Sequence, residues 1–193
     1  VNKYQYNQIL IKTFKSVSTH GASAFYNGVI AEAIVAAVKN HAQNPGVLSL
    51  NDMRNYRAKT REPICAKYRA YKICSMPPPS SGGIALLQML GMLEKFDLSS
   101  LRPNSSGAIH LISEAGRLAY ADRARYVADS DFVEVPLARL LDPSYLAQRA
   151  ELIQTEKSMG VAQPGEVMAE KISQADDNAL EFNSTSHISI VDG

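Results

Sequence analysis

The stretch Pro-Pro-Pro-Ser-Ser-Gly-Gly at residues 77–83, with the apolar run that follows it at 84–96, decides how this chain is organised. Three consecutive prolines donate no backbone hydrogen bonds and favour an extended conformation. Ser80 or Ser81 is suited to cap a helix that begins directly afterwards. Residues 84–96 are apolar on almost every face, which predicts a buried helix. No lysine follows the two glycines, so we interpret 77–83 as a rigid turn rather than a phosphate-binding loop.

Further elements are expected on both sides of this turn. Apolar residues spaced three and four apart predict helices over residues 5–19, 22–41 and 105–127. Ser49, with Asp52 three residues on, predicts a capped short helix over 49–56, and Asp142-Pro143 predicts the start of a helix over 143–153. Between them, the alternating run at 61–76 predicts a β-hairpin that turns near Tyr68-Arg69. In the helix over 105–127, Glu114 is spaced for surface pairs with His110 and Arg117. The inward face of that helix is expected to carry Ile109, Ile112, Ala115, Leu118 and Ala119.

Composition excludes several classes of protein. The chain has 193 residues, a net charge of +1, 46% hydrophobic and 20% charged residues, which is incompatible with a disordered or collagen-like chain. The near-zero charge gives no electrostatic reason to expect a nucleic acid as a partner. The chain begins at Val1 and ends on the turn signal Asp192-Gly193, so it is expected to be a piece of a longer protein.

Neither the cysteines nor the histidines form a metal-binding pattern. Cys65 and Cys74 are expected to be two half-buried thiols in the hairpin, and they would pair if the protein is secreted. The four histidines are scattered without metal-ligand spacing. We therefore expect neither a metal nor a cofactor.

Chemistry is expected where a polar segment meets the last strand. Residues 154–184 show no sustained periodicity and indicate a long, mobile segment, whereas 187–191 alternate as a strand does. Thr185 lies at this junction. If the chain were cleaved before Thr185, its new α-amine, with a pKa near 8, would act as a general base for its own hydroxyl. The simpler reading is a Ser/Thr cluster at the start of a strand, and the residues alone leave both open.

Motifs spread over nearly the whole chain resemble the γ-glutamyltranspeptidase family, from the C-terminal half of its large subunit to the first residues of its small subunit. The ordered series and the proline-rich turn make the resemblance specific. The motifs are Phe25-Tyr26-Asn27-Gly28-Val29-Ile30-Ala31-Glu32, Tyr68-Arg69-Ala70-Tyr71, Ser75-Met76-Pro77-Pro78-Pro79-Ser80-Ser81-Gly82-Gly83, Ala119-Tyr120-Ala121-Asp122-Arg123, Asp131-Phe132-Val133-Glu134-Val135-Pro136 and Thr185-Ser186-His187-Ile188-Ser189-Ile190-Val191-Asp192.

The resemblance implies an α+β fold, the N-terminal-nucleophile hydrolase architecture with two stacked sheets between helical layers (αββα). This chain would supply part of it, mostly helices with a β-hairpin and a C-terminal strand. Residues 1–153 would be the helical layer and hairpin of the large subunit. Residues 154–184 would be a mobile segment before the cleavage site, displaced after cleavage, and 185–193 the first strand of the small subunit.

The resemblance also implies a reaction. The Thr185 hydroxyl would attack the carbonyl of Ser184, and hydrolysis of the resulting ester would split the chain between the two residues. The freed Thr185 would then be the catalytic nucleophile towards glutathione and other γ-glutamyl compounds. Water, an acceptor amino acid or a peptide would resolve the γ-glutamyl ester. His187 would orient the junction.

Other parts of the machinery are implied to lie outside this chain. In the family, the arginine that binds the substrate carboxylate, the oxyanion-hole glycines and most γ-glutamyl-binding residues belong to the remaining large- and small-subunit segments, and Gly82-Gly83 is a different element. The substrate-binding residues are therefore unknown here, and the isolated chain is expected to be inactive. The alternatives are a cephalosporin acylase or capsule-degrading transpeptidase of the same fold, or a non-catalytic homologue. A periplasmic or secreted location is expected.

Overall fold

The computed structural model describes residues 3–167. These residues belong to two compact units that divide after Lys59, and each unit is described by itself. The expected strand at 187–191 lies outside the described residues.

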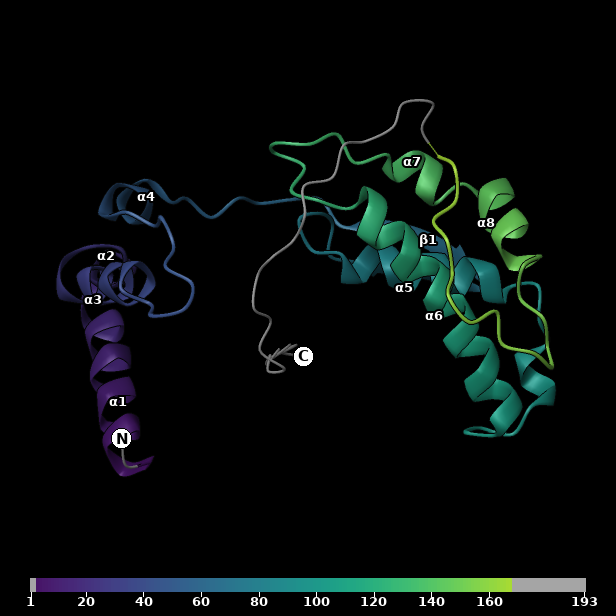
Figure 1. Ribbon diagram of the computed structural model, residues 1–193, viewed down its shortest axis with the longest axis horizontal. Coiled ribbons are helices and arrows are strands. Elements are labelled where there is room, and N and C mark those ends of the chain that lie inside the picture. The colour runs from purple at the N-terminus through teal and green to yellow at the C-terminus, as the bar shows by residue number, and fades with distance from the viewer. Residues whose placement is uncertain (1–2, 168–193) are drawn as a thin grey trace. The chain divides into compact units, whose positions relative to one another are not determined.

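The described part of the first unit is helical (Figure 1). It consists of α1 (Lys3–His20), α2 (Ser23–Tyr26), α3 (Gly28–Lys39) and α4 (Leu50–Asn55). Its buried core is small and combines Ala31 and Val35 of α3 with Met53 of α4. Partly buried aromatic and aliphatic side chains pack around it, namely Phe25, Tyr26, Ile34, Leu48 and Leu50.

The helix ends of this unit follow local sequence signals. The single helix expected over 22–41 is wrong, because Asn27 is extended and Gly28 has a φ of 64°, which breaks the run into α2 and α3. This is a backbone conformation that glycine adopts without cost. The α4 helix is confirmed, with a reciprocal cap: the Asp52 amide donates to Ser49 Oγ at 3.2 Å, and Asp52 Oδ2 accepts from the Ser49 amide at 2.8 Å.

The second unit begins with the predicted hairpin. Strands β1 (Ile64–Tyr68) and β2 (Tyr71–Ser75) pair antiparallel, and Arg69, with a φ of 54°, makes the turn. Cys65 lies directly opposite Cys74, and the two form a disulfide. The expectation of two free thiols was therefore wrong. Opposite residues of an antiparallel pair share one face with their Cβ atoms close together, so this register brings the two sulfurs within bonding reach.

The turn at 77–83 leads into α5 (Gly82–Leu93), as predicted. Ser81 takes the position before the helix, but its side chain does not cap it and instead accepts a hydrogen bond from Arg123 Nε at 2.8 Å. A Cβ on Gly83 would collide with the Met76 carbonyl oxygen and lie 3.1 Å from Ser75 Oγ, so the return of the chain past β2 needs glycine there. The helix is buried along most of its length, although Leu86 remains 42% exposed.

Helix α6 (Ser106–Tyr126) runs beside α5 and forms the main core with it (Figure 1). Its buried residues in this core are Leu111, Ala115, Leu118 and Ala119. Ile109 and Ile112 were wrongly expected to face inward and are 53% and 46% exposed. The buried stripe is completed by Glu114 and Asp122, two acidic residues in line with Leu118.

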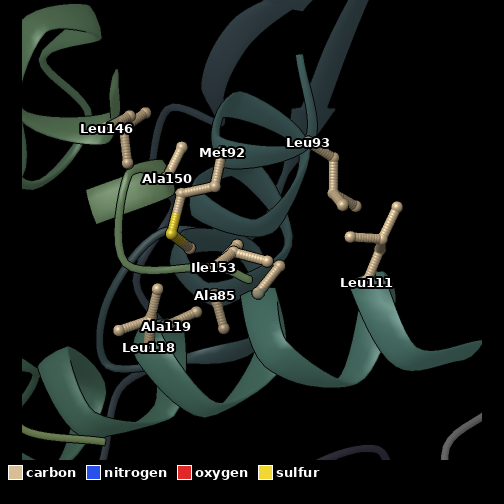
Figure 2. Packing of buried hydrophobic residues seen from close by; sticks show 10 residues of the cluster. Ala85, Met92, Leu93, Leu111, Leu118, Ala119, Leu146, Ala150 and Ile153 are labelled. Atoms are coloured by element: carbon tan, nitrogen blue, oxygen red, sulfur yellow. The ribbon is translucent and has the colours of Figure 1, made fainter. Parts of the chain in front are cut away.

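Two short helices complete the unit. After α7 (Leu137–Leu140), the Asp142 side chain caps α8 (Pro143–Ala150) by accepting from the Tyr145 amide at 3.1 Å, and proline occupies the first helical turn, as predicted. Leu146 and Ala150 of α8, and Ile153 just beyond it, pack on α5 and α6 (Figure 2). The sandwich layers implied by the family resemblance go beyond the two-stranded sheet that the described residues contain.

Candidate functional site

The predicted cleavage junction, Ser184 and Thr185, lies outside the described residues. The structure does describe the first part of the segment that leads to it, residues 154–167. This part of the chain is attached to α6 and α8 at two places. Each attachment is built around one buried carboxylate of α6.

Asp122 is the centre of the first attachment and is 1% exposed. Its Oδ1 accepts hydrogen bonds from the Gly165 amide at 2.8 Å and from Arg149 Nη2 at 3.2 Å. Its Oδ2 accepts from the Tyr145 hydroxyl at 2.7 Å and from Gln88 Nε2 at 3.0 Å. Four donors thus satisfy both oxygens of the carboxylate, and Arg149 balances its charge.

The partners of Asp122 extend the attachment. Arg149 Nη2 also donates to the Gln163 carbonyl at 2.7 Å, and the Tyr126 hydroxyl donates to the Gly165 carbonyl at 2.5 Å. Burial, together with the hydrogen bond and negative charge of Asp122, raises the pKa of Tyr145 far above its usual value. Tyr145 therefore stays protonated and remains a donor at any physiological pH.

Glu114 is the centre of the second attachment and is also 1% exposed. Its oxygens accept from the Met159 amide at 2.7 Å and from Ser158 Oγ at 2.8 Å. Arg117 lies 3.0 Å from Glu114 and donates to the Gly160 carbonyl at 2.8 Å. The predicted Glu114–Arg117 pair is confirmed as an ion pair, but its carboxylate is buried rather than on the surface.

These hydrogen bonds decide the charge of Glu114. Burial alone would raise its pKa, but the hydrogen bonds from Met159 and Ser158 and the positive charge of Arg117 outweigh burial and lower the pKa. The carboxylate is therefore ionised at neutral pH. It remains an acceptor for the segment under those conditions.

Residues 158–167, the part of the expected mobile segment that the structure describes most fully, make specific contacts with the second unit. Within residues 154–167, Met159 and Ala162 pack against the main core, and Val167 is 7% exposed. The physical reason is the pair of carboxylates, which supply partners for a stretch that has no secondary structure of its own. Residues 168–184 lie outside the described residues, so the prediction for them stays a prediction.

The sequence itself contains a signal for the two attachments. Glu114, Leu118 and Asp122 are four residues apart and therefore share one face of α6. Glu114 was assigned to a surface pair, and Asp122 was given no role although it lies in one of the family motifs. An acidic residue in register with a buried leucine indicates a buried carboxylate with partners elsewhere.

The chemistry of this network is structural rather than catalytic. Its carboxylates are occupied by donors from the chain, and they hold backbone groups in place. Within residues 3–167, no group of three or more His, Cys, Asp or Glu side chains is placed to hold a metal ion. In the same residues, no helix has the length and apolar character needed to cross a membrane.

Comparison with known proteins shows which class of proteins the chain is similar to. The chain is 38% identical over 184 residues to a glutathione hydrolase proenzyme of Escherichia coli K12, covering 95% of this chain and 30% of that protein. It is 42% identical over 146 residues to the acylase ACY 1 proenzyme of a Pseudomonas strain, covering 76% of this chain and 26% of that protein. Both relatives are proenzymes, one of a glutathione hydrolase and one of an acylase.

Similarity in structure narrows the class to a family. The fold matches the crystal structure of Helicobacter pylori γ-glutamyltranspeptidase with a TM-score of 0.69 and 38% identity, covering 88% of this chain and 48% of that chain. The γ-glutamyltranspeptidase family model matches residues 2–193. The chain belongs to the γ-glutamyltranspeptidase family. It spans about 30% of the length of the E. coli relative that it matches.

Proposed function

We propose that this chain is part of a γ-glutamyl hydrolase and transferase that activates itself by cleavage before Thr185. The observation that carries the proposal is the family match over residues 2–193, which includes the Ser184–Thr185 junction. The proenzyme names of the relatives support a processed precursor. The assignment of Thr185 rests on the motif at 185–192.

Cleavage needs a nucleophile and one water molecule. The Thr185 hydroxyl adds to the Ser184 carbonyl carbon, its proton passes to the Thr185 nitrogen, and collapse breaks the peptide C–N bond, so the acyl group moves from nitrogen to oxygen. Water then hydrolyses the ester, which leaves a carboxylate on Ser184 and a free amine and hydroxyl on Thr185. The free amine has a reference pKa near 8 and is suited to accept the hydroxyl proton during turnover.

Turnover would then proceed through a covalent intermediate. The Thr185 hydroxyl attacks the γ-carbonyl of glutathione or another γ-glutamyl amide, and the leaving amine takes a proton. Water releases glutamate from the resulting ester, or an acceptor amino acid or peptide takes the γ-glutamyl group. Two successive substrates on one enzyme group predict ping-pong kinetics.

This activity belongs to the whole protein. The chain spans only part of its relatives, so the remaining large- and small-subunit segments are proposed as its partners. We therefore expect no turnover from the 193-residue chain alone. Robust, Thr185-dependent hydrolysis of a γ-glutamyl anilide by this isolated chain would contradict that expectation.

An acylase acting on cephalosporin side chains is the second candidate. The observation that favours it is the similarity to the ACY 1 proenzyme, 42% over 146 residues, and to a Bacillus halodurans cephalosporin acylase structure at 27% identity and a TM-score of 0.62. Both candidates use the same nucleophile, so self-cleavage does not distinguish them, whereas a comparison of their substrates does.

A periplasmic or secreted location is proposed as well. Its support is the Cys65–Cys74 disulfide, since disulfides persist mainly in oxidising compartments. Alkylation of the protein in intact cells, before and after reduction, measures whether the two cysteines are paired there. Free thiols in freshly isolated protein would speak against this location.

The enzymatic proposal is tested on the full-length protein. We expect it to hydrolyse a γ-glutamyl anilide with a much higher kcat/KM than a glutaryl or adipyl cephalosporin. Thr185→Ala should abolish both activities, and Thr185→Ser, which keeps a hydroxyl, should retain a fraction. The opposite preference would establish the acylase. Unchanged activity in the Thr185→Ala variant would overturn the proposal.

A further inference from the structure

We propose that Asp122 and Glu114 are positioning residues for self-cleavage, which hold residues 158–165 so that the chain starts towards Thr185 from a fixed point. The inference rests on the proposed function, because it concerns the cleavage reaction. Neither carboxylate is proposed to touch the reacting atoms. Each acts through the segment that it binds.

The two carboxylates form a two-point attachment. They lie on one face of α6, eight residues apart, which is about 12 Å along the helix axis. Glu114 binds the start of the attached stretch at Ser158 and Met159, and Asp122 binds its end at Gly165. Two separated points of attachment fix the direction of the chain as well as its place.

The bonds go mainly to the backbone of the segment. Met159 and Gly165 are held through their amides, and Arg117 and Arg149 hold two carbonyls, those of Gly160 and Gln163. Burying two carboxylates is costly, and core stability alone is served as well by apolar side chains. What this arrangement provides is a defined path for the irregular stretch 158–165.

The attachment sets the last fixed point of the described chain before the junction. Gly165 lies 20 residues before Thr185 in the sequence, whereas Ile153, the last core residue before the attached stretch, lies 32 residues before it. Loop closure falls with the 3/2 power of the number of residues between the joined points, which gives about a twofold difference between these two separations. The loss of direction adds to this factor.

The attachment also predicts protection from proteolysis. Lys157 is exposed and directly precedes the stretch bound by Glu114. A protease needs several residues around the cut bond to leave the fold, which the two carboxylates prevent. The Lys157–Ser158 bond should therefore resist trypsin both before and after self-cleavage.

The test compares charge-removing variants with matched controls in the full-length protein. Asp122→Asn and Glu114→Gln are isolated as folded precursors, and their cleavage is followed on a denaturing gel. Asp129→Asn and Glu151→Gln are the controls, since these carboxylates are exposed and face Arg61 and Lys95. Trypsin cutting at Lys157 is measured by mass spectrometry, and the kcat of the cleaved enzyme is measured separately.

We expect the first-order constant for cleavage to fall at least twofold in each of the two variants and further in the double variant. Cutting at Lys157 should become faster, while the controls and the kcat of cleaved enzyme should not change. A purely structural role would reduce the amount of folded precursor and leave its first-order constant unchanged. A cleavage constant in these variants equal to that of wild type would overturn the proposal. A Lys157–Ser158 bond that stays resistant to trypsin in them would overturn it as well.

A second pair of variants keeps the test decisive if the charge changes prevent folding. Tyr126→Phe removes only the hydroxyl that binds the Gly165 carbonyl, and Gly165→Ala places a methyl group against the Tyr145 ring. Both should slow cleavage in the same way, and wild-type constants in both would overturn the proposal. If the Thr185→Ala precursor still splits, the proposed function fails, and the positioning role fails with it. The rate of trypsin cutting after Lys157 is measured independently of that result.

Discussion

Asp122 and Arg149 form an ion pair in the interior of the second unit, with Asp122 Oδ1 3.2 Å from Arg149 Nη2 and side chains that are 1% and 8% exposed. The pair joins α6 to α8, and both of its members also bind the segment at 163–165. Loss of this pair should therefore both destabilise the unit and release the segment that follows α8.

Removing one partner of this pair should be costly. Asp122→Ala leaves the Arg149 charge buried without its counter-ion, so we expect the free energy of unfolding to fall by about 3–5 kcal/mol. Urea denaturation measures the loss. The double variant with Arg149→Met should lose less than the sum of the two single changes, because neither charge remains unpaired. Strict additivity would show that the two groups do not interact.

The Glu114 carboxylate should make stability depend on pH. Its pKa is lower in the folded protein than in the unfolded chain, so protonation favours unfolding. Its contribution is present above the unfolded pKa and is lost as the pH falls from about 5 through the lowered pKa. Glu114→Gln should be less stable than wild type at pH 7, and the difference should shrink by pH 3.

Other carboxylates with lowered pKa values, Asp52, Asp97 and Asp142, contribute to acid unfolding in both proteins. The measured quantity is therefore the difference in unfolding free energy between wild type and Glu114→Gln across the pH series. If the difference in unfolding free energy did not change with pH, the contacts with Ser158 and Met159 would not lower the pKa of Glu114.

The hairpin disulfide should stabilise the second unit. Cys65 and Cys74 are nine residues apart, and closing a loop of that length in the unfolded chain contributes about 2–3 kcal/mol in the chain-entropy account. We expect a reducing agent to lower the melting temperature of the wild type. The Cys65→Ser/Cys74→Ser double variant should melt near the reduced wild type and should not respond to the reducing agent. Equal melting temperatures for oxidised and reduced wild type would contradict this.

Two adjacent glycines give a matched pair of substitutions. Gly83→Ala places its methyl group against the Met76 carbonyl oxygen, and we expect a loss of about 1–3 kcal/mol. A Cβ on Gly82 meets nothing within 4 Å, so Gly82→Ala should be neutral or slightly stabilising. Thermal melts of the two variants distinguish them. Similar losses at both positions would show that a general intolerance of the turn, not this close approach, is responsible.

The sequence was informative where a local signal acts alone. The hairpin turn at Arg69, the Ser49 cap and the buried helix after Gly83 follow from turn chemistry, capping and apolar content, and all three are confirmed. The break at Gly28 was missed because glycine inside an apolar pattern looks like part of the helix until its φ is known.

Long-range partners were harder to predict. Glu114 and Asp122 bind residues more than 40 positions away, and the disulfide depends on a register that sequence spacing alone left open. The cleavage junction itself was proposed from motif resemblance. Its residues lie outside those described, so Ser184 and Thr185 stay a prediction from the sequence.

The N-terminal sequence of the small fragment of the purified full-length protein decides whether the chain cleaves itself before Thr185. Self-cleavage there predicts two bands on a denaturing gel, with the smaller fragment beginning Thr-Ser-His-Ile, and one uncut band for Thr185→Ala. A full-length protein that stays in one piece while active, or a small fragment that begins at another residue, would contradict it.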